Sequence, residues 1–238
     1  MDIKLLISTI GACFMTAAFN VHAALVTVPV TVEATANIWS SGHAAPESLT
    51  GGAGTLSEII NIPIGHDGTL TIENVTGMID YGPCCAENGA DGISVPSGGI
   101  GPAIDYRGIA GMDIPRGIFL SGVFLDDNEP MDPSPSHLVI NDIGFSALSP
   151  DLAQSFFIGD GLTGTGSGST QIFNIPNNAT RLFLGFHDSF NGLPGFFQDN
   201  TGSLSLNANF NTIPIPAAVW LFGSGLIGLI GISRRKKA

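Results

Sequence analysis

Positive charge is almost absent from residues 24–212, which contain no lysine and only the arginines Arg107, Arg116 and Arg181. The whole chain has 20 acidic residues, and all of them except Asp2 fall within this range. Nucleic acids and anionic lipids bind through basic surfaces, so this composition excludes them as partners of the segment. Cations and neutral polymers fit it better, although an acidic surface also serves solubility alone.

Cysteine is equally scarce, with three residues in the chain. Cys13 lies in a segment that we expect to be removed, and Cys84 and Cys85 are adjacent. Neighbouring Cα atoms lie about 3.8 Å apart, less than the ~5.5 Å typical of a disulfide. A strained vicinal bridge, reduced thiols and a link between two molecules all stay open. A disulfide framework is excluded, so the fold must depend on its apolar core.

The sequence also lacks the common catalytic motifs. It has neither a Gly-x-Ser-x-Gly nor a His-Glu-x-x-His pattern, and its histidines are scattered without zinc-site spacing. Chance pairs of carboxylates are inevitable among so many acids, which makes a glycosidase the least favoured function. We expect a protein that is not an enzyme.

Both ends of the chain carry targeting signals. Residues 1–23 have the order of a signal peptide: a basic start at Lys4, an apolar stretch, and the small-residue cleavage site Val21-His22-Ala23. At the other end, Ile213–Ile232 carries no charge and would span about 30 Å as a transmembrane helix. The basic end of the chain, residues 233–238, would stay in the cytoplasm. The expected mature domain is therefore residues 24–212.

The C-terminal segment, residues 213–238, resembles the PEP-CTERM sorting tail in its variant with an apolar second signature residue. The resemblance rests on Pro214, on Pro216-Ala217 followed by Ala-Val-Trp-Leu-Phe, and on the basic residues Arg234 and Arg235. It implies a Gram-negative bacterium, export, an inner-membrane intermediate recognised by an exosortase, and removal of the tail near Pro214–Ala217. The processed protein would reside at the cell surface or in the extracellular matrix.

Residues 24–212 are predicted to be all-β. Val26, Val28, Val30 and Val32 alternate with polar residues and with Pro29, which suits an edge strand. Short strands separated by Gly-rich turns favour a β-sandwich. The other predicted strands are Glu58–Ile64, Thr69–Val75, Ile118–Leu125, Leu138–Ile140, Gln171–Ile175, Arg181–Phe186 and Ser203–Phe210, the last with Leu204, Leu206, Ala208 and Phe210 inward.

Three smaller features complete the structural expectations. Ser149-Pro150-Asp151-Leu152 is typical of a helix start. Trp39 is predicted to pack in the interior, with stacking on a sugar ring as the alternative. The core is expected to contain Phe119, Phe124, Phe156, Phe157, Phe173 and Phe183.

The best candidate for a site lies in residues 181–206, which are predicted to form strand, loop and strand. Asp188 ends one strand, and Asp199-Asn200 precedes the next. A hairpin would bring these oxygens together with loop carbonyls, and a calcium ion requires six to eight such ligands at ~2.3–2.6 Å. Spacing alone leaves open a hairpin in which these residues only cap turns. His187 is expected at an exposed strand end.

This segment resembles the calcium loop of galactophilic bacterial lectins of the PA-I type, which are galactose-binding-like β-sandwiches. The resemblance implies that Asp188, Asp199 and Asn200 bind calcium through side chains and Phe196 through its carbonyl. Tyr81-Gly82-Pro83 matches the family's remaining ligand, a tyrosine carbonyl. In those lectins calcium binds the sugar directly. The residues that contact the sugar's primary hydroxyl have no clear equivalents here, so the sugar contacts stay unknown.

A second acidic cluster lies at residues 126–132, with Asp126, Asp127, Glu129 and Asp132. Its neighbouring prolines favour an exposed loop over a cation site. The expected function is therefore an exported, calcium-dependent carbohydrate-binding protein that acts with exopolysaccharide or another glycan in a biofilm. The alternative is a structural matrix protein that calcium stabilises and that binds no sugar.

Overall fold

The computed structural model describes residues 24–82, 86–94 and 102–213. The predicted signal peptide, the sorting tail with Pro214, Pro216, Ala217, Arg234 and Arg235, and the pair Cys84 and Cys85 lie outside the described residues. Within the described ranges, no helix is long and apolar enough to cross a membrane. The structure is 50% strand and 4% helical, which confirms the all-β prediction.

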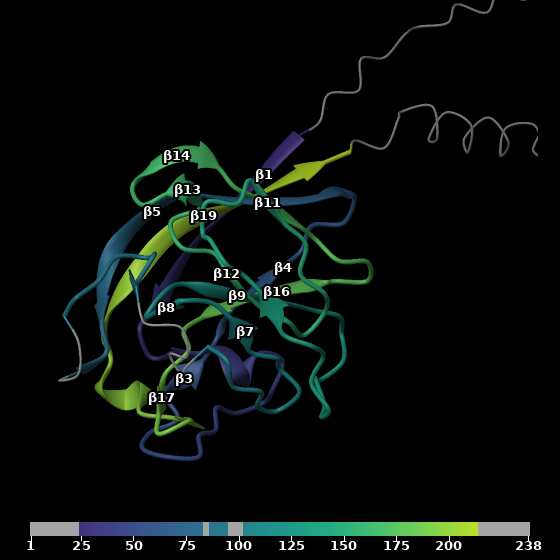
Figure 1. Cartoon of the computed structure of the whole chain (residues 1–238). Coiled ribbons are helices and arrows are strands. Elements are labelled where there is room, and N and C mark those ends of the chain that lie inside the picture. The colour runs from purple at the N-terminus through teal and green to yellow at the C-terminus, as the bar shows by residue number, and fades with distance from the viewer. Residues whose placement is uncertain (1–23, 83–85, 95–101, 214–238) are drawn as a thin grey trace, which may run out of the picture. The chain divides into compact units, whose positions relative to one another are not determined.

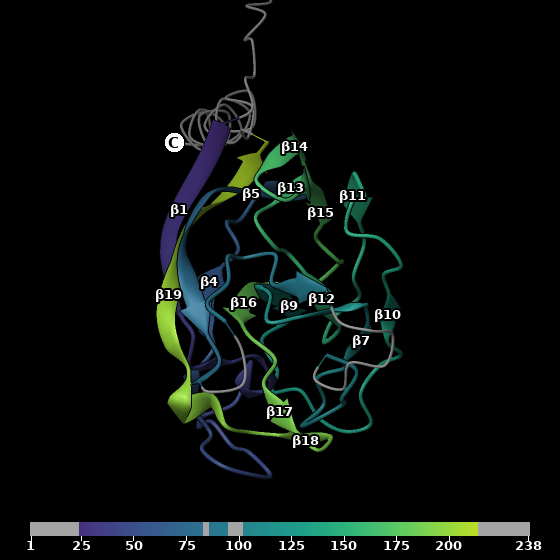
Figure 2. The ribbon, with the colours of Figure 1, turned by 60° about the vertical axis from the view of Figure 1, so that its left-hand side comes forward.

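The larger sheet is built around two long strands (Figures 1 and 2). Its order is β1 (Ala24–Glu33), β19 (Thr201–Thr212), β5 (His66–Asp80), β15 (Ile172–Asn174) and β11 (Ala147–Leu148). Neighbours are antiparallel except for the parallel pair β11 and β15. Pro29 lies in β1 at the edge of this sheet, as predicted, where its missing N–H breaks no ladder.

The second sheet has four antiparallel strands in the order β12 (Ser155–Phe157), β9 (Ser121–Leu125), β16 (Arg181–Gly185) and β4 (Glu58–Asn61). Figure 2 shows β16, β9 and β12 beside the layer of β1, β19 and β5. The other described pairs are β2 (Ala36–Asn37) with β3 (Thr55–Leu56), β6 (Ile93–Ser94) with β8 (Arg116–Gly117), β7 (Met112–Asp113) with β10 (Leu138–Val139), β13 (Leu162–Gly164) with β14 (Ser167–Thr170), and β17 (Ser189–Phe190) with β18 (Leu193–Pro194).

One apolar core joins the two larger sheets. Phe156 of β12 stacks on Phe124 of β9 at 5.0 Å and packs on Phe173 of β15 at 5.5 Å between ring centroids. The same cluster contains inward residues of β5 and β19. A second cluster lies around Trp39 of the 3-10 helix η1 (Ile38–Ser40) and includes Val123. Strand β9 is therefore buried on both faces, and all six predicted core phenylalanines are buried.

Two local expectations are wrong. The segment predicted as a helix start is a turn: the Gln154 side-chain oxygen accepts the Asp151 amide at 2.8 Å, and Ala153 has φ of 61°. The chain then enters β12, because the apolar residues that follow complete the second sheet. In β19, Asn209 alternates with the inward residues and is therefore predicted to face outward, but it is buried, and its side-chain oxygen accepts the Thr27 hydroxyl at 2.7 Å. The inward positions Leu204, Leu206, Ala208 and Phe210 are confirmed.

Candidate metal centre

The predicted calcium residues are brought together by the connection between β16 and β19. After β16 the chain passes Asp188, forms the β17–β18 hairpin and the 3-10 helix η3 (Phe197–Asp199), and enters β19. The Gly195 amide donates to the Asp188 carbonyl at 3.0 Å, which closes the base of the hairpin. Asp188 therefore lies close in space to Asp199 and Asn200, although the sequence separates them by a loop.

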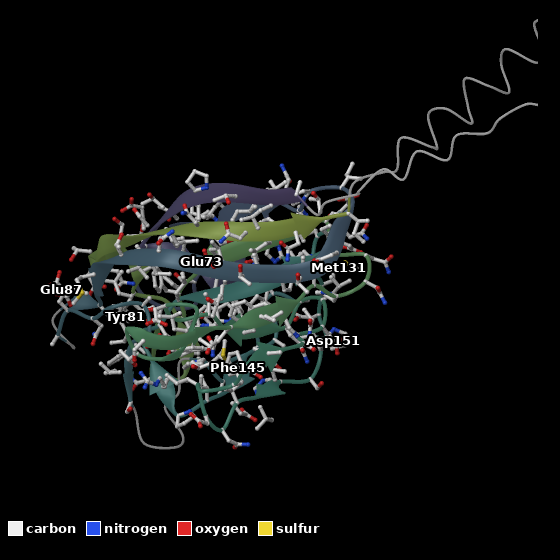
Figure 3. All side chains as sticks on the ribbon, turned by 90° about the horizontal axis from the view of Figure 1, so that it is seen from above. Glu73, Tyr81, Glu87, Met131, Phe145 and Asp151 are labelled. Carbon is white, nitrogen blue, oxygen red and sulfur yellow. The ribbon has the colours of Figure 1, made fainter. Side chains whose placement is uncertain are left out.

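Tyr81 and Gly82 reach the same place from the end of β5. Strand β19 pairs with β5 in a register that puts Thr201 opposite Asp80, so the residues just beyond these partners meet. A Cβ atom on Gly82 would lie 2.8 Å from the Asp199 Oδ2, which measures how closely that carboxylate packs on the Tyr81-Gly82 turn. Figure 3 shows Tyr81 near the end of β5. We call Asp188, Asp199, Asn200, Tyr81 and Gly82 the hairpin site.

The electrostatics of the hairpin site centre on Asp188, which is buried. Burial raises the pKa of its carboxyl to about 7, and the charge of Asp199 acts in the same direction. Hydrogen bonds from the Asn200 side chain and the Ser189 amide lower that pKa in part. Burial also raises the pKa of Tyr81 well above its usual range, with a contribution from the Asp188 charge. The site thus holds negative charge that its surroundings solvate poorly.

The oxygen atoms of the hairpin site fit a hard cation. The Asn200 side-chain nitrogen donates to the Ala34 carbonyl at 3.1 Å, whereas its Oδ1 is buried without a hydrogen-bond partner. One carboxylate oxygen of the neighbouring residue Asp80 is also buried without a partner. Buried acceptors without donors are costly unless a cation or a proton satisfies them. Carboxylate and amide oxygens are the ligands that calcium prefers.

Phe196 lies at the turn that presents Asp199. It adopts φ of 69°, and its carbonyl accepts the Asp199 amide at 3.4 Å, a long hydrogen bond. Its own amide donates to the Thr50 carbonyl at 3.3 Å, which fixes the turn to the loop before β3. The predicted carbonyl ligand is therefore within the turn that carries the carboxylate.

His187 is not at an exposed strand end, as expected, but buried. Its Nδ1 lies 3.0 Å from the Ser121 hydroxyl, and its ring meets Trp39 edge to face at 5.1 Å. Burial lowers its pKa to about 3, so the ring is neutral. Trp39 is fully buried and donates from Nε1 to the Ile104 carbonyl at 3.0 Å. Packing is confirmed for Trp39, and stacking on a sugar is excluded.

The acidic cluster at residues 126–132 is an exposed loop, as predicted. Protein donors satisfy its carboxylates: Asp127 accepts the Thr180 hydroxyl at 2.6 Å, and Asp132 accepts the Gly108 amide at 2.9 Å. Across the described part of the chain, no three His, Cys, Asp or Glu residues group as metal ligands. The hairpin site has two such residues, and its remaining ligands would be amide and backbone oxygens.

Comparison of the chain with family models, with curated proteins and with solved structures found no match.

Proposed function

We propose that this protein is an exported, exosortase-sorted protein of the cell surface or extracellular matrix whose β-sandwich domain binds carbohydrate with the help of calcium. The observation that carries the proposal is the convergence of Asp188, Asp199 and Asn200 with the Tyr81-Gly82 turn. These residues come from two segments that are far apart in the sequence, and they correspond to the ligand positions of PA-I-type lectins. The core shared by the two larger sheets supports a sandwich of this kind.

In the proposed site, calcium would be held by the side chains of Asp188, Asp199 and Asn200 and by the Tyr81 and Phe196 carbonyls. Calcium supplies open coordination positions that hydroxyl groups of a sugar can fill. The chain orients these ligands: Asn200 is fixed to Ala34, and the Asp199 carboxylate is exposed beside Gly82. The sugar would therefore approach on the Asp199 side, and exopolysaccharide or another matrix glycan is the expected partner.

A second candidate function has its own supporting observation. Asp188 and Asn200 are 9% and 4% exposed, so most of the site is covered by protein. Such burial favours calcium that stabilises the fold of a structural matrix protein and contacts no glycan. Both candidates place calcium at the same residues, and they differ only in whether a coordination position stays open.

Glycan binding separates the two candidates. The full chain in mild detergent is passed over immobilised galactose and over matrix polysaccharide, in calcium and then in chelator. Retention that the chelator and Asp188→Ala abolish, and that Asp127→Ala leaves intact, supports the carbohydrate-binding function. Calcium-dependent stability without retention identifies the structural function, and no response to calcium contradicts both.

The sorting tail is tested separately in cells. Deletion of residues 213–238 is expected to release the domain without surface retention, because the membrane helix and the exosortase signal are lost together. Unchanged surface attachment of the deleted chain would contradict the sorting function.

A further inference from the structure

A second pair of carboxylates, one buried and one half-buried, lies away from the hairpin site in a pocket of about 240 Å³. The pocket lies between β5, the turn before β6, and the β13–β14 hairpin. Figure 1 shows β13 and β14 beside β5. The polar side chains that line it are Asp91, Asp160 and Thr165.

Asp91 is 4% exposed and has one satisfied and one unsatisfied carboxylate oxygen. Its Oδ1 accepts the Asp160 amide at 2.8 Å, and a Cβ on Gly159 would lie 2.3 Å from that atom, so the carboxylate is packed tightly against the turn after β12. Its Oδ2 is buried and has no hydrogen-bond partner. An ionised oxygen in that position is costly unless a positive ligand meets it.

Asp160 adds a second carboxylate to the same pocket. Its Oδ1 accepts the Leu162 amide at 2.9 Å and its Oδ2 accepts the Gly166 amide at 2.6 Å, which orients the carboxylate and leaves lone pairs on both oxygens. Burial raises the pKa of Asp160, and the charge of Asp91 raises it further. The hydrogen bonds from the Gly166 and Leu162 amides lower this pKa in part, and the pKa stays raised.

No protein cation neutralises this pair within the described ranges. Neither carboxylate takes part in an ion pair there. Arg116 lies near the pocket, but its guanidinium donates to the main-chain carbonyl of Asp91 at 3.0 Å and not to the carboxylate. A cation or a proton from solution would balance the charge of this pocket.

We propose that this pocket binds a divalent metal cation of the calcium type, with the Asp91 Oδ2, the Asp160 carboxylate and the Thr165 hydroxyl as protein ligands and water as the rest. All three are hard oxygen ligands, and none of the described residues that line the pocket is a histidine or cysteine, which disfavours zinc and copper. The bound ion would fasten the β13–β14 hairpin and the turn before β6 to β5. This site is independent of the hairpin site and of the proposed function.

Calorimetric titration of the full chain in mild detergent with calcium alone tests the proposal through its stoichiometry. We expect two calcium ions per chain for the wild type and one for Asp91→Asn, which keeps the Oδ1 acceptor but removes the charge. Asp142→Asn, at an exposed loop carboxylate, is the matched control and should retain both ions. An unchanged stoichiometry in Asp91→Asn overturns the pocket proposal.

Asp188→Ala in the same titration separates this proposal from the proposed function. If Asp188→Ala keeps the full stoichiometry while Asp91→Asn loses an ion, the pocket site stands and the hairpin site fails. If Asp188→Ala loses an ion and Asp91→Asn does not, the pocket site fails and the hairpin site stands.

A second variant guards against loss of folding in Asp91→Asn. Thr165 is exposed in the hairpin turn, so Thr165→Lys places an ammonium group at the pocket with little effect on packing. We expect the tethered cation to weaken calcium binding at this site at least tenfold, whereas Thr165→Gln, of similar length and neutral, should weaken it much less. Equal affinities in the lysine and glutamine variants would overturn the proposal.

Discussion

The hairpin site and the exposed loop at residues 126–132 are both acidic, and they differ in what surrounds their oxygens. In the loop, each of Asp127 and Asp132 accepts a hydrogen bond from a protein donor and stands in solvent. In the hairpin site, Asp188 is buried next to a second carboxylate, and Asn200 keeps a buried oxygen without a donor. The comparison teaches that buried acceptors without donors indicate a cation site better than the density of acidic residues does.

The largest expected effect is on the pH dependence of stability in chelator. Asp188 has a folded pKa of about 7, so its contribution to the free energy of unfolding is fully present below about pH 4. This contribution, at most ~4 kcal/mol, is lost as the pH rises to about 7. His187 acts in the opposite direction. Its folded pKa is about 3, so its contribution to the free energy of unfolding is fully present above about pH 6.5 and is lost as the pH falls. The two slopes offset each other between about pH 4 and 6.5.

In the variant Asp188→Asn the Asp188 contribution is absent, so the pH dependence of stability that His187 causes should become visible. Urea unfolding from pH 4 to 8 is expected to show the variant gaining stability relative to the wild type as the pH rises to about 7. Asp127→Asn, in the exposed loop, should run parallel to the wild type throughout. An Asp188→Asn curve parallel to the wild type would show that Asp188 is not buried as the structure has it.

The second effect is on stabilisation by calcium. An ion that binds only the folded state raises the free energy of unfolding by about 2.7 kcal/mol at a hundredfold excess over Kd. Thermal melts should show this increase for the wild type and for Asp127→Ala. The substitutions Asp188→Ala and Asp199→Ala should lower the affinity for calcium and therefore make the stabilisation by calcium smaller. If Asp127→Ala is the sensitive variant, the exposed loop binds calcium and the hairpin site does not.

The third expected effect comes from moving the Asp199 carboxylate without removing it. Gly82 has φ of 63°, and an added methyl group would lie 2.8 Å from the Asp199 Oδ2. Gly82→Ala should cost about 1–2 kcal/mol of stability and displace Asp199, which weakens calcium binding. Gly68→Ala, where φ is 91° and an added Cβ meets nothing within 4 Å, is the control for backbone strain alone. Equal calcium affinity in the two variants would argue against a role for Asp199.

The smallest effect is expected in the exposed loop. Asp127→Asn keeps an acceptor for the Thr180 hydroxyl, so its free energy of unfolding should stay within about 0.5 kcal/mol of the wild type. Urea unfolding at neutral pH measures this difference. A decrease in the free energy of unfolding of more than about 2 kcal/mol would mean that the charge of Asp127 stabilises the fold.

The sequence predicted the fold where its pattern was periodic. The alternating valines of β1 and the alternating apolar residues of β19 specify two half-buried strands, and they pair in register along their length. Ser149-Pro150-Asp151 failed as a helix start because the apolar run that follows is needed in the second sheet. Short-range signals of this kind do not include the tertiary contacts that override them.

The candidate site was predictable to a similar degree. The spacing of Asp188 and Asp199-Asn200 predicts that a hairpin joins them, and the structure brings them together. The burial of His187 was missed because no pattern in the sequence shows that η1 and β9 cover that strand end. The Asp91–Asp160 pocket was missed for the same reason: two isolated aspartates meet only through the turns before β6 and after β12.

The most direct test is a diffraction measurement on crystals of the protein grown in calcium. The account predicts a calcium ion within about 2.3–2.6 Å of side-chain oxygens of Asp188, Asp199 and Asn200, with the Tyr81 and Phe196 carbonyls in its shell. Well-ordered density for these side chains without an ion, at saturating calcium, would contradict it.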